Sequence, residues 1–282
     1  MKTLLTIISA LTLIGTISGE FTLDIPVIET MVFVEGGTFY NGASDVTVLS
    51  FYIDNIEITQ NKYLAIMGVN PSTYKGDNRP VDGATWFDAV KFCNLLSISE
   101  GLVPCYAFSS YGTYPNDWPK EWNTKPKNSL LVSCNWKVNG YRLPTEAEWE
   151  FAARGGNYTN GFIYSGSDNL ELVGAYLHEE NYINVDPAVK SGTRTVGSFK
   201  ANELGIYDMS GNIAEWCWDV FGKYPKSAQI NPTGPITGSK RINRGGGWGG
   251  FAMYCEVRFR WKVAPTISKY SSYGFRICKS AE

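Results

Sequence analysis

Arg241-Ile-Asn-Arg-Gly-Gly-Gly-Trp-Gly-Gly250 opens the last stretch of the chain, and Gly274-Phe-Arg-Ile277 closes it. The residues between these motifs follow neither the period of a strand nor that of a helix, and Gly and Pro265 interrupt them, so a loop is predicted. Aromatic residues and arginines crowd this loop. Such residues form a binding surface when a rigid scaffold holds the loop, or they fill a core beneath it. The pattern alone leaves both interpretations open.

The composition is that of a globular protein with many turns. The 282 residues are 44% hydrophobic, which is enough for a sizeable core, and they include 29 Gly and 13 Pro. The formal net charge is −2, and no basic block occurs. We therefore expect no nucleic-acid partner and no polyanion-binding site.

Residues 1–19 have the features of an export signal. A single lysine precedes an apolar stretch that is too short to span a bilayer, and small residues follow it. A buried N-terminal helix is the alternative interpretation. Position 20 of the short leader at 20–30 is Glu20, whereas a bacterial lipoprotein box requires Cys there, so lipidation is not expected. We expect an exported protein of the periplasm or cell surface, without a transmembrane segment.

Three segments carry start and stop signals of helices, and two carry the alternation of strands. Residues 31–39 and 46–58 are the predicted strands. No repeat and no convincing linker follows residue 30, so 31–282 is expected to be one domain. The predicted helices are 59–67, with Thr59 as N-cap and Gly68 as stop; 86–100, with Thr85 and Asp88 at capping-box spacing; and a helix after Thr145 and Glu148 that Gly155 closes.

Cysteines are expected to be able to pair in an exported protein. Cys105 and Cys134 flank residues 102–139, which we interpret as an ordered insertion loop. A disulfide between them would close this loop and stabilise the fold by about 3–4 kcal/mol. The alternative is that both are small buried apolar residues. Cys93 lies on a helix face and is expected to be a free thiol in the core.

Four ordered blocks form one pattern. They lie at 80–86 (Pro-Val-Asp-Gly-Ala-Thr-Trp), at 140–156, at 205–218, and at 244–248 (Arg-Gly-Gly-Gly-Trp) continued by Gly-Phe-Arg at 274–276. The pattern resembles the sulfatase-modifying-factor domain, the family of the formylglycine-generating enzyme, and it covers residues 31–278. The resemblance implies an α+β, C-type-lectin-like fold with two main helices, small twisted antiparallel sheets and many ordered loops.

The chemical centre of the family's oxidases is altered in this sequence. In those enzymes two cysteines, five residues apart, bind copper(I), for which thiolates are suitable soft ligands. The second matches Cys255 here, but the first falls on Gly250. The sequence therefore predicts no copper site and no enzyme. His178 is the only histidine, and no nucleophile motif lies near it, so we interpret it as a solvated surface residue.

A non-enzymatic subset of the family is more similar to this chain. These are the variable proteins of bacterial diversity-generating retroelements, whose C-terminal loops are rewritten by mutagenic reverse transcription. Trp248, Ala252, Cys255, Arg260 and Pro265 match their framework positions. The resemblance implies a variable region at about 244–276. The residues at variable or ligand-binding positions are Gly249, Gly250, Phe251, Met253, Tyr254, Glu256, Arg258, Phe259, Trp261, Lys262, Val263 and Ala264. Trp261 fits less well, because adenine changes in an Asn codon do not produce a Trp codon.

The sequence thus predicts a monomeric ligand-binding protein whose partner is an unknown protein or small molecule. Seven side chains are expected to form one solvent-facing surface, the C-terminal patch, which consists of Phe251, Met253, Tyr254, Arg258, Phe259, Trp261 and Lys262. A copper-dependent oxidase of the same family is the leading alternative. An envelope protein whose C-terminal aromatic residues belong to the core is another.

The resemblance also implies a calcium ion in the turn at 208–215. Asp208 and Glu215 would supply carboxylate oxygens, and Gly211 and Ile213 would supply backbone carbonyls, which are ligands that suit calcium. In the alternative arrangement Asp208 caps a turn and Glu215 pairs with an arginine. The sequence does not decide between the two.

Overall fold

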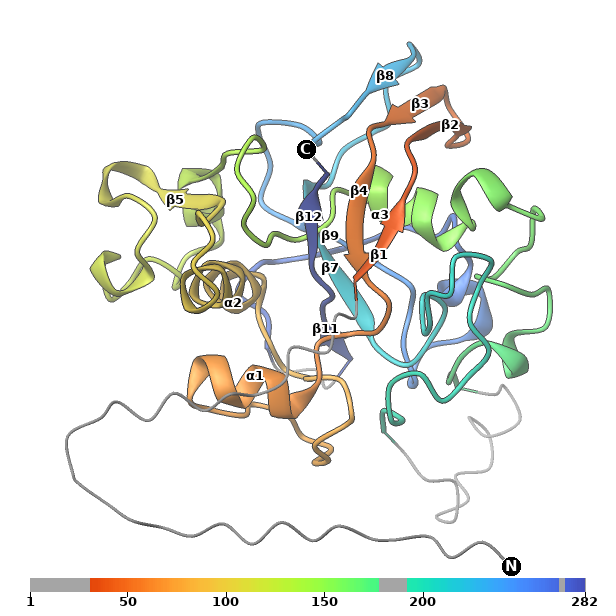
Figure 1. Ribbon diagram of the computed structural model, residues 1–282, viewed down its shortest axis with the longest axis horizontal. Coiled ribbons are helices and arrows are strands. Elements are labelled where there is room, and N and C mark those ends of the chain that lie inside the picture. The colour runs from red at the N-terminus through yellow and green to blue at the C-terminus, as the bar shows by residue number, and fades with distance from the viewer. Residues whose placement is uncertain (1–30, 178–191, 269–271, 282) are drawn as a thin grey trace, which may run out of the picture.

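The computed structural model describes residues 31–177, 192–268 and 272–281. Within these residues the fold is α+β, with three α-helices and four small sheets joined by long ordered loops (Figure 1). The C-terminal strand pairs with a strand near the N-terminal end of the described chain, so the two ends of the domain close on each other (Figure 1).

The helices lie where local capping signals predict them. α1 (Gln60–Met67) begins at Thr59, whose side chain accepts from the Lys62 N–H, and ends at Gly68, whose φ of +72° suits glycine. α2 (Trp86–Ser99) and α3 (Glu146–Ala153) both begin with capping boxes, formed by Thr85 with Asp88 and by Thr145 with Glu148. The three predicted helices are therefore confirmed.

Strands from distant parts of the sequence build each sheet. The first sheet has the order β1 (Met31–Val34), β4 (Phe51–Asp54), β12 (Cys278–Ser280) and is antiparallel. The second, which we call the site sheet, has the order β10 (Trp261–Val263), β9 (Arg241–Arg244), β7 (Ala214–Val220), β11 (Tyr273–Gly274). The third has the order β2 (Gly37–Tyr40), β3 (Asp45–Val48), β8 (Gln229–Ile230), and β5 (Tyr106–Phe108) with β6 (Val132–Cys134) forms a hairpin.

The sheets refine the strand predictions. Each of the two predicted strands is in fact a pair of strands, β1 with β2 and β3 with β4, because a turn divides each segment. The insertion at 102–139 contains the hairpin β5–β6, and the stretch between Gly250 and Gly274, which was predicted to be a loop, contains the strand β10. Short 3-10 helices also occur in the loops, at Ser109–Tyr111, Pro115–Asp117, Pro126–Leu131, Gly156–Tyr158, Leu170–Leu172 and Ala252–Cys255.

Two hydrophobic clusters form the main core. One surrounds α2, where the Phe92 ring packs edge-on against Phe275 with 5.2 Å between ring centroids. The other lies between α3 and the first and third sheets, and it contains Trp149 and Phe151. Phe275 of the Gly-Phe-Arg motif is thus a core residue that fixes the C-terminal segment to α2.

Buried ion pairs join α3 to the C-terminal segment. Arg244, which is fully buried, donates to Glu150 of α3, and Arg260 donates to both oxygens of Glu146 at 2.6 Å. Both carboxylates are buried and paired, so these acidic positions of α3 hold the C-terminal segment rather than face solvent.

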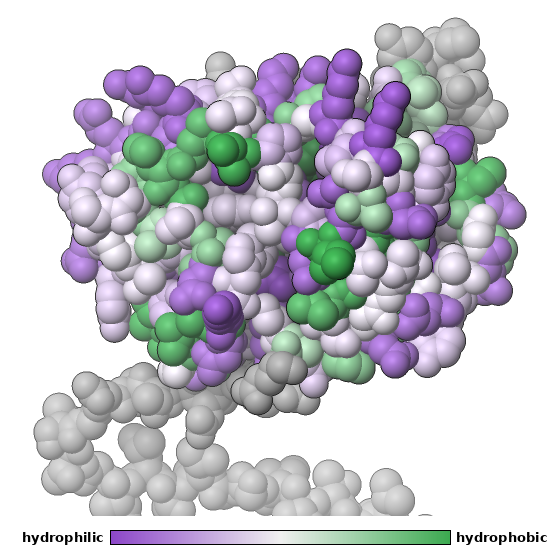
Figure 2. Space-filling view, turned by 90° about the horizontal axis from the view of Figure 1, so that it is seen from above, coloured by the Kyte–Doolittle hydropathy of each residue, from purple (hydrophilic) through white to green (hydrophobic). Residues whose placement is uncertain are grey.

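The surface is mixed in character. On the face shown in Figure 2, hydrophobic side chains occur in small separate groups among hydrophilic ones. Within the described residues no helix combines the length and the apolar character needed to span a membrane.

Candidate ligand-binding site

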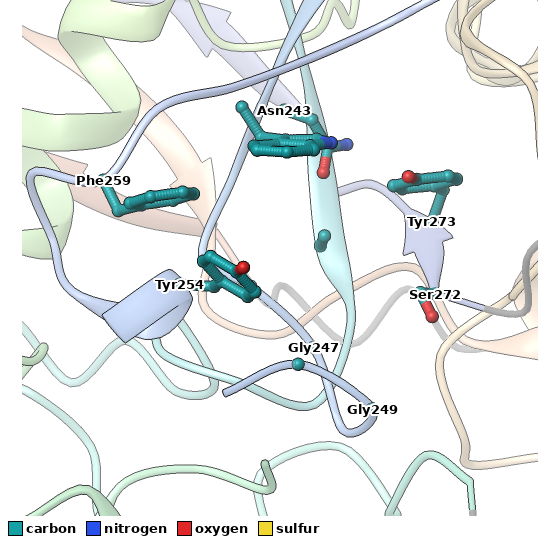
Figure 3. A pocket seen from close by; sticks show the side chains of 11 residues that line it. Asn243, Gly247, Gly249, Tyr254, Phe259, Ser272 and Tyr273 are labelled. Atoms are coloured by element: carbon teal, nitrogen blue, oxygen red, sulfur yellow. The ribbon is translucent and has the colours of Figure 1, made fainter. Parts of the chain in front are cut away.

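A pocket of about 240 Å³ opens beside the site sheet (Figure 3). Four strands of this sheet, with the loops that join them, contribute its walls. The residues that line it are Ala214, Asn243, Gly246, Gly247, Gly249, Gly250, Tyr254, Phe259, Trp261, Ser272 and Tyr273.

Strand pairing brings these residues together. Asn243 at the centre of β9 lies opposite Trp261 of β10 on one side and Trp216 of β7 on the other. Tyr273 of β11 pairs in parallel with Ala214 of β7. Since directly opposed residues on neighbouring strands point to the same face, the sheet register places Asn243 and Trp261 together.

The glycine loop after β9 forms another wall. Gly246 has a φ of +66°, and a Cβ atom there would lie 2.8 Å from the Cys255 Sγ, so a larger residue would clash. The Trp248 N–H donates to the Asn212 carbonyl at 2.9 Å, and the Gly250 N–H donates to the Gly247 carbonyl at 2.8 Å. The loop is therefore held against the turn that precedes β7.

An aromatic cluster forms the wall opposite Tyr273. The Tyr254 ring lies 5.0 Å from Phe259 and 6.0 Å from Trp261, and Phe259 and Trp261 are stacked with an interplanar angle of 17°. Figure 3 shows Tyr254 and Phe259 on one side of the pocket and Tyr273 on the other, with Asn243 between them. A flat group would thus meet aromatic side chains on two sides.

The C-terminal patch is at the surface rather than in the core. Met253 and Trp261 are 54% and 50% exposed, Arg258 and Lys262 are also exposed, and the other three side chains are half-buried. Tyr254, Phe259 and Trp261 of the patch line the pocket, as do Gly249 and Gly250. The alternative in which these aromatic residues fill the core beneath the loop is therefore wrong.

Three of the remaining residues in the predicted site lie away from the pocket lining. Glu256 is half-buried and pairs with Arg258 at 3.0 Å, and Ala264 is half-buried. Val263 corrects the prediction, because its side chain is buried in the core cluster around α2. The reason is its register in the sheet, because Val263 lies opposite the buried Arg241, whose guanidinium packs on Trp86 of α2.

The sequence did not indicate several residues of the site. Ala214 and Ser272 carry no chemical signal in the sequence, and only strand pairing places them at the pocket. Asn243 had a weak signal, because it is an uncharged amide between the arginine and isoleucine residues that precede the glycine loop. Tyr273 belongs to the aromatic content of the C-terminal stretch but was not assigned to the site.

The polar side chains of the lining are one amide, one serine hydroxyl, two phenols and one indole. None of the residues that line the pocket is His, Cys, Asp, Glu, Lys or Arg. Cys255 is fully buried and lies outside the lining, and burial raises the pKa of its thiol to about 12. Gly250 lies at the lining, where the oxidases of the resembling family carry their other cysteine. One buried, protonated thiol does not form a paired thiolate site.

In the turn at 208–215, Glu215 pairs with an arginine, which is the alternative to calcium binding that the sequence left open. Its carboxylate accepts from Arg276 at 2.7 Å through both oxygens and from the Trp149 Nε1–H at 2.8 Å. Asp208 accepts from the Gly197 N–H through Oδ2, and burial raises its pKa to about 6. Asp208 keeps one oxygen without a partner, as does the neighbouring Glu57, but Glu215 is taken up by Arg276 and Trp149, so the predicted pair of Asp208 with Glu215 is not available for calcium. In the described part of the chain no cluster of three or more His, Cys, Asp or Glu is arranged for a metal.

Cys105 and Cys134 are adjacent thiols in the structure. Cys134 is paired in register with Tyr106 across the hairpin, and the Cys105 and Cys134 thiols hydrogen-bond to each other. This hydrogen bond lowers the pKa of Cys105, whereas burial raises the pKa of Cys134. Cys93 is buried on α2 as a free thiol, as predicted. The signal, the leader with Glu20, and His178 lie outside the described residues.

Comparisons with known proteins agree with this geometry. Residues 23–281 match the family described as the sulfatase-modifying factor enzyme 1-like domain. A Paenibacillus barcinonensis protein named chaperone protein LppX is 40% identical over 247 residues, which cover 83% of this chain and 84% of that protein. A Streptomyces coelicolor formylglycine-generating enzyme is 36% identical over 167 residues, covering 55% of this chain and about half, 51%, of the enzyme.

A solved structure gives the same result for the fold. The Treponema denticola variable protein 1 superposes with a TM-score of 0.74 and 31% sequence identity, over 89% of this chain and 95% of that protein. The match supports the C-type-lectin-like, loop-rich fold class predicted from the sequence. With its fold, its motifs and nearly its whole length in agreement, this chain belongs to the family of the sulfatase-modifying factor enzyme 1-like domain.

Proposed function

We propose that this protein is a non-enzymatic, exported ligand-binding protein whose C-terminal surface a retroelement diversifies. The observation that carries the proposal is how the segment 249–261 is held. Arg244 donates to the Phe259 carbonyl, the Leu177 N–H donates to the Gly250 carbonyl, and the Val257 N–H donates to the Ile163 carbonyl. Backbone groups therefore anchor the segment.

Backbone anchoring leaves most side chains of the segment free to change. A carbonyl accepts a hydrogen bond whatever side chain its residue carries, so the identities of Met253 and Trp261 matter little for the fold. Arg244 and Arg260 are the framework side chains that contact the segment. They pair with the carboxylates of Glu150 and Glu146 on α3. A surface built in this way suits repeated sequence variation. The similarity to a variable protein of Treponema denticola supports the same function.

The gene provides the sharpest test of diversification. We expect a near-copy of the 3′ end downstream of the coding sequence, differing at adenines and accompanied by a reverse transcriptase. Among sequenced isolates, codons of the C-terminal patch should vary while those of Arg244 and Asn243 stay constant. A locus with no near-copy and no variation among isolates would refute the retroelement part of the proposal.

A protein is the class of ligand that we propose. The 40% identical relative carries the name of a chaperone protein. The pocket also lies within a wider exposed surface, since Met253 at 54% and Arg258 exposed beside it extend the contact area. Pockets for an anchor side chain within a larger surface are typical of protein recognition.

An oxidase is the second candidate, because relatives of this chain are named formylglycine-generating enzymes. Protein loaded with copper(I) should be incubated with a cysteine peptide of the sulfatase type and analysed by mass spectrometry. We expect no formylglycine above the metal-only background. Gly250 stands where the family's oxidases have one of their two cysteines, and the remaining thiol, that of Cys255, is buried. Turnover that the Cys255→Ser variant abolishes would establish the oxidase instead.

A further inference from the structure

The floor of the pocket contains an amide nitrogen that is an unused hydrogen-bond donor. Asn243 is only 1% exposed, and its Nδ2 has no hydrogen-bond partner in the structure. Its side chain borders the pocket (Figure 3). Buried polar groups without a partner are rare in folded proteins, and each one is unfavourable unless something else satisfies it. The pocket is the route by which a ligand atom would reach this donor.

The side chains opposite Asn243 in the sheet offer its Nδ2 no acceptor, because both are tryptophans and an indole N–H only donates. Its cross-strand neighbours are Trp216 and Trp261, and the Trp216 Nε1–H already donates to the Ala84 carbonyl. An apolar residue between two tryptophans would pack without leaving an unpaired donor. Asn243 is therefore better explained by an acceptor that arrives from outside the chain.

The pocket limits the group that brings this acceptor. Its volume of about 240 Å³ exceeds the roughly 150 Å³ of a cavity that holds benzene, so one substituted six-membered ring fits. Aromatic side chains border it on two sides, and no charged side chain lines it. The group is therefore flat, neutral and ring-sized, with one hydrogen-bond acceptor at its buried end.

We propose that the pocket receives a tyrosine side chain of a protein partner, whose phenolic oxygen accepts from the Asn243 Nδ2. The inference rests on the proposed ligand-binding function and names the group that is bound. The ring of that tyrosine lies between the Tyr254–Phe259 wall and Tyr273. A sugar ring suits the pocket less, because it brings several hydroxyl groups and the lining offers few polar side chains to satisfy them. A phenylalanine would leave the Asn243 donor unpaired.

Two matched probes test the phenolic oxygen. N-acetyl-tyrosinamide and N-acetyl-phenylalaninamide differ only in this atom, and methyl β-D-glucopyranoside represents the sugar alternative. Binding to the full chain is measured by ligand-observed saturation-transfer NMR titration. We expect the tyrosine probe to bind about tenfold more tightly than the phenylalanine probe, because one buried hydrogen bond separates them. We expect the glucoside to bind more weakly than both.

The variant Asn243→Leu identifies the donor. It should bind both amino-acid probes equally, and without ligand its melting temperature should rise, because an unpaired donor is removed. Asn243→Val serves the same purpose if leucine does not fit the site. The exposed Asn116→Leu is the matched control and should keep the tenfold preference.

Several results would overturn the assignment. They are equal binding of the two probes to the unmodified protein, a preference that survives Asn243→Leu, tighter binding of the glucoside, or a fall in the melting temperature of both Asn243→Leu and Asn243→Val. If neither amino-acid probe binds while the gene locus shows diversification, the tyrosine assignment fails and the proposed function stands. If the locus shows no diversification but the probes behave as expected, the retroelement part of the proposed function is refuted and the tyrosine assignment is supported.

Discussion

Replacing Arg276 by methionine is expected to destabilise the protein strongly. The Arg276 side chain is fully buried, and it donates to both Glu215 oxygens at 2.7 Å and to the carbonyls of Asp54 and Tyr207 at 3.0 and 2.9 Å. Glu57 is also buried nearby, and burial raises its pKa well above the ordinary range. Removing the guanidinium leaves Glu215 charged and without its cation.

The magnitude follows from these contacts. Breaking a buried ion pair by removing one partner costs about 3–5 kcal/mol, and the two orphaned carbonyls add about 1 kcal/mol each. The total is comparable to the whole stability of many domains, about 5–15 kcal/mol. The double variant Arg276→Met with Glu215→Gln should recover about 2–3 kcal/mol, because the buried charge is gone while the Trp149 Nε1–H keeps an acceptor.

Urea unfolding followed by tryptophan fluorescence provides the free energies, and circular dichroism provides the melting temperatures. Arg258→Met is the matched control, since Arg258 is 76% exposed and its surface pair with Glu256 contributes at most about 1 kcal/mol. An Arg276→Met variant within about 1 kcal/mol of the unmodified protein would refute the reasoning. A double variant no more stable than the single one would also refute it, because the cost would then not come from the uncompensated carboxylate.

Three further predictions concern cysteines, pH and calcium. Mild oxidation should join Cys105 to Cys134 and raise stability by about 3–4 kcal/mol, and peptide mapping without reduction that finds two free thiols would contradict this. Burial and then Glu146 raise the pKa of Asp219 from 3.8 to about 8, so the folded state keeps a proton that the unfolded state has lost. Stability should therefore fall as pH rises from about 4 to about 8, by at most about 1.4 kcal/mol per unit, and a slope unchanged in Asp219→Asn would disprove this origin. Calcium added after chelator treatment should leave the melting temperature unchanged, whereas a rise that Asp208→Asn abolishes would restore the calcium site.

The helices could be predicted because their signals are local. A capping box needs only residues three positions apart, and Thr85 with Asp88 or Thr145 with Glu148 fulfils it without tertiary information. The strands β7 and β9 could not be predicted in the same way. They are buried on both faces and contain Glu215 and Arg244, so they lack the alternation of a half-exposed strand. Ion pairs with distant residues make these charged positions possible.

The candidate site was predicted in part for the same reason. Tyr254, Phe259 and Trp261 lie within eight residues of one another, so aromatic content alone marked this wall. The opposite wall comes from Ala214 and Tyr273, which parallel pairing brings together across almost sixty residues. Pairing over such separations leaves no local pattern in a single sequence.

The end of β10 shows how far variation of this surface is compatible with the fold. Trp261 and Lys262 face solvent, so a change of either side chain leaves no cavity, but Val263 packs in the core cluster around α2. Cys255 is buried likewise, one residue from the half-buried Tyr254. The segment therefore alternates between side chains that the core requires and side chains that a ligand would meet. Because backbone carbonyls and framework arginines hold the segment in place, recognition can change at the second kind of position while the first kind preserves the scaffold.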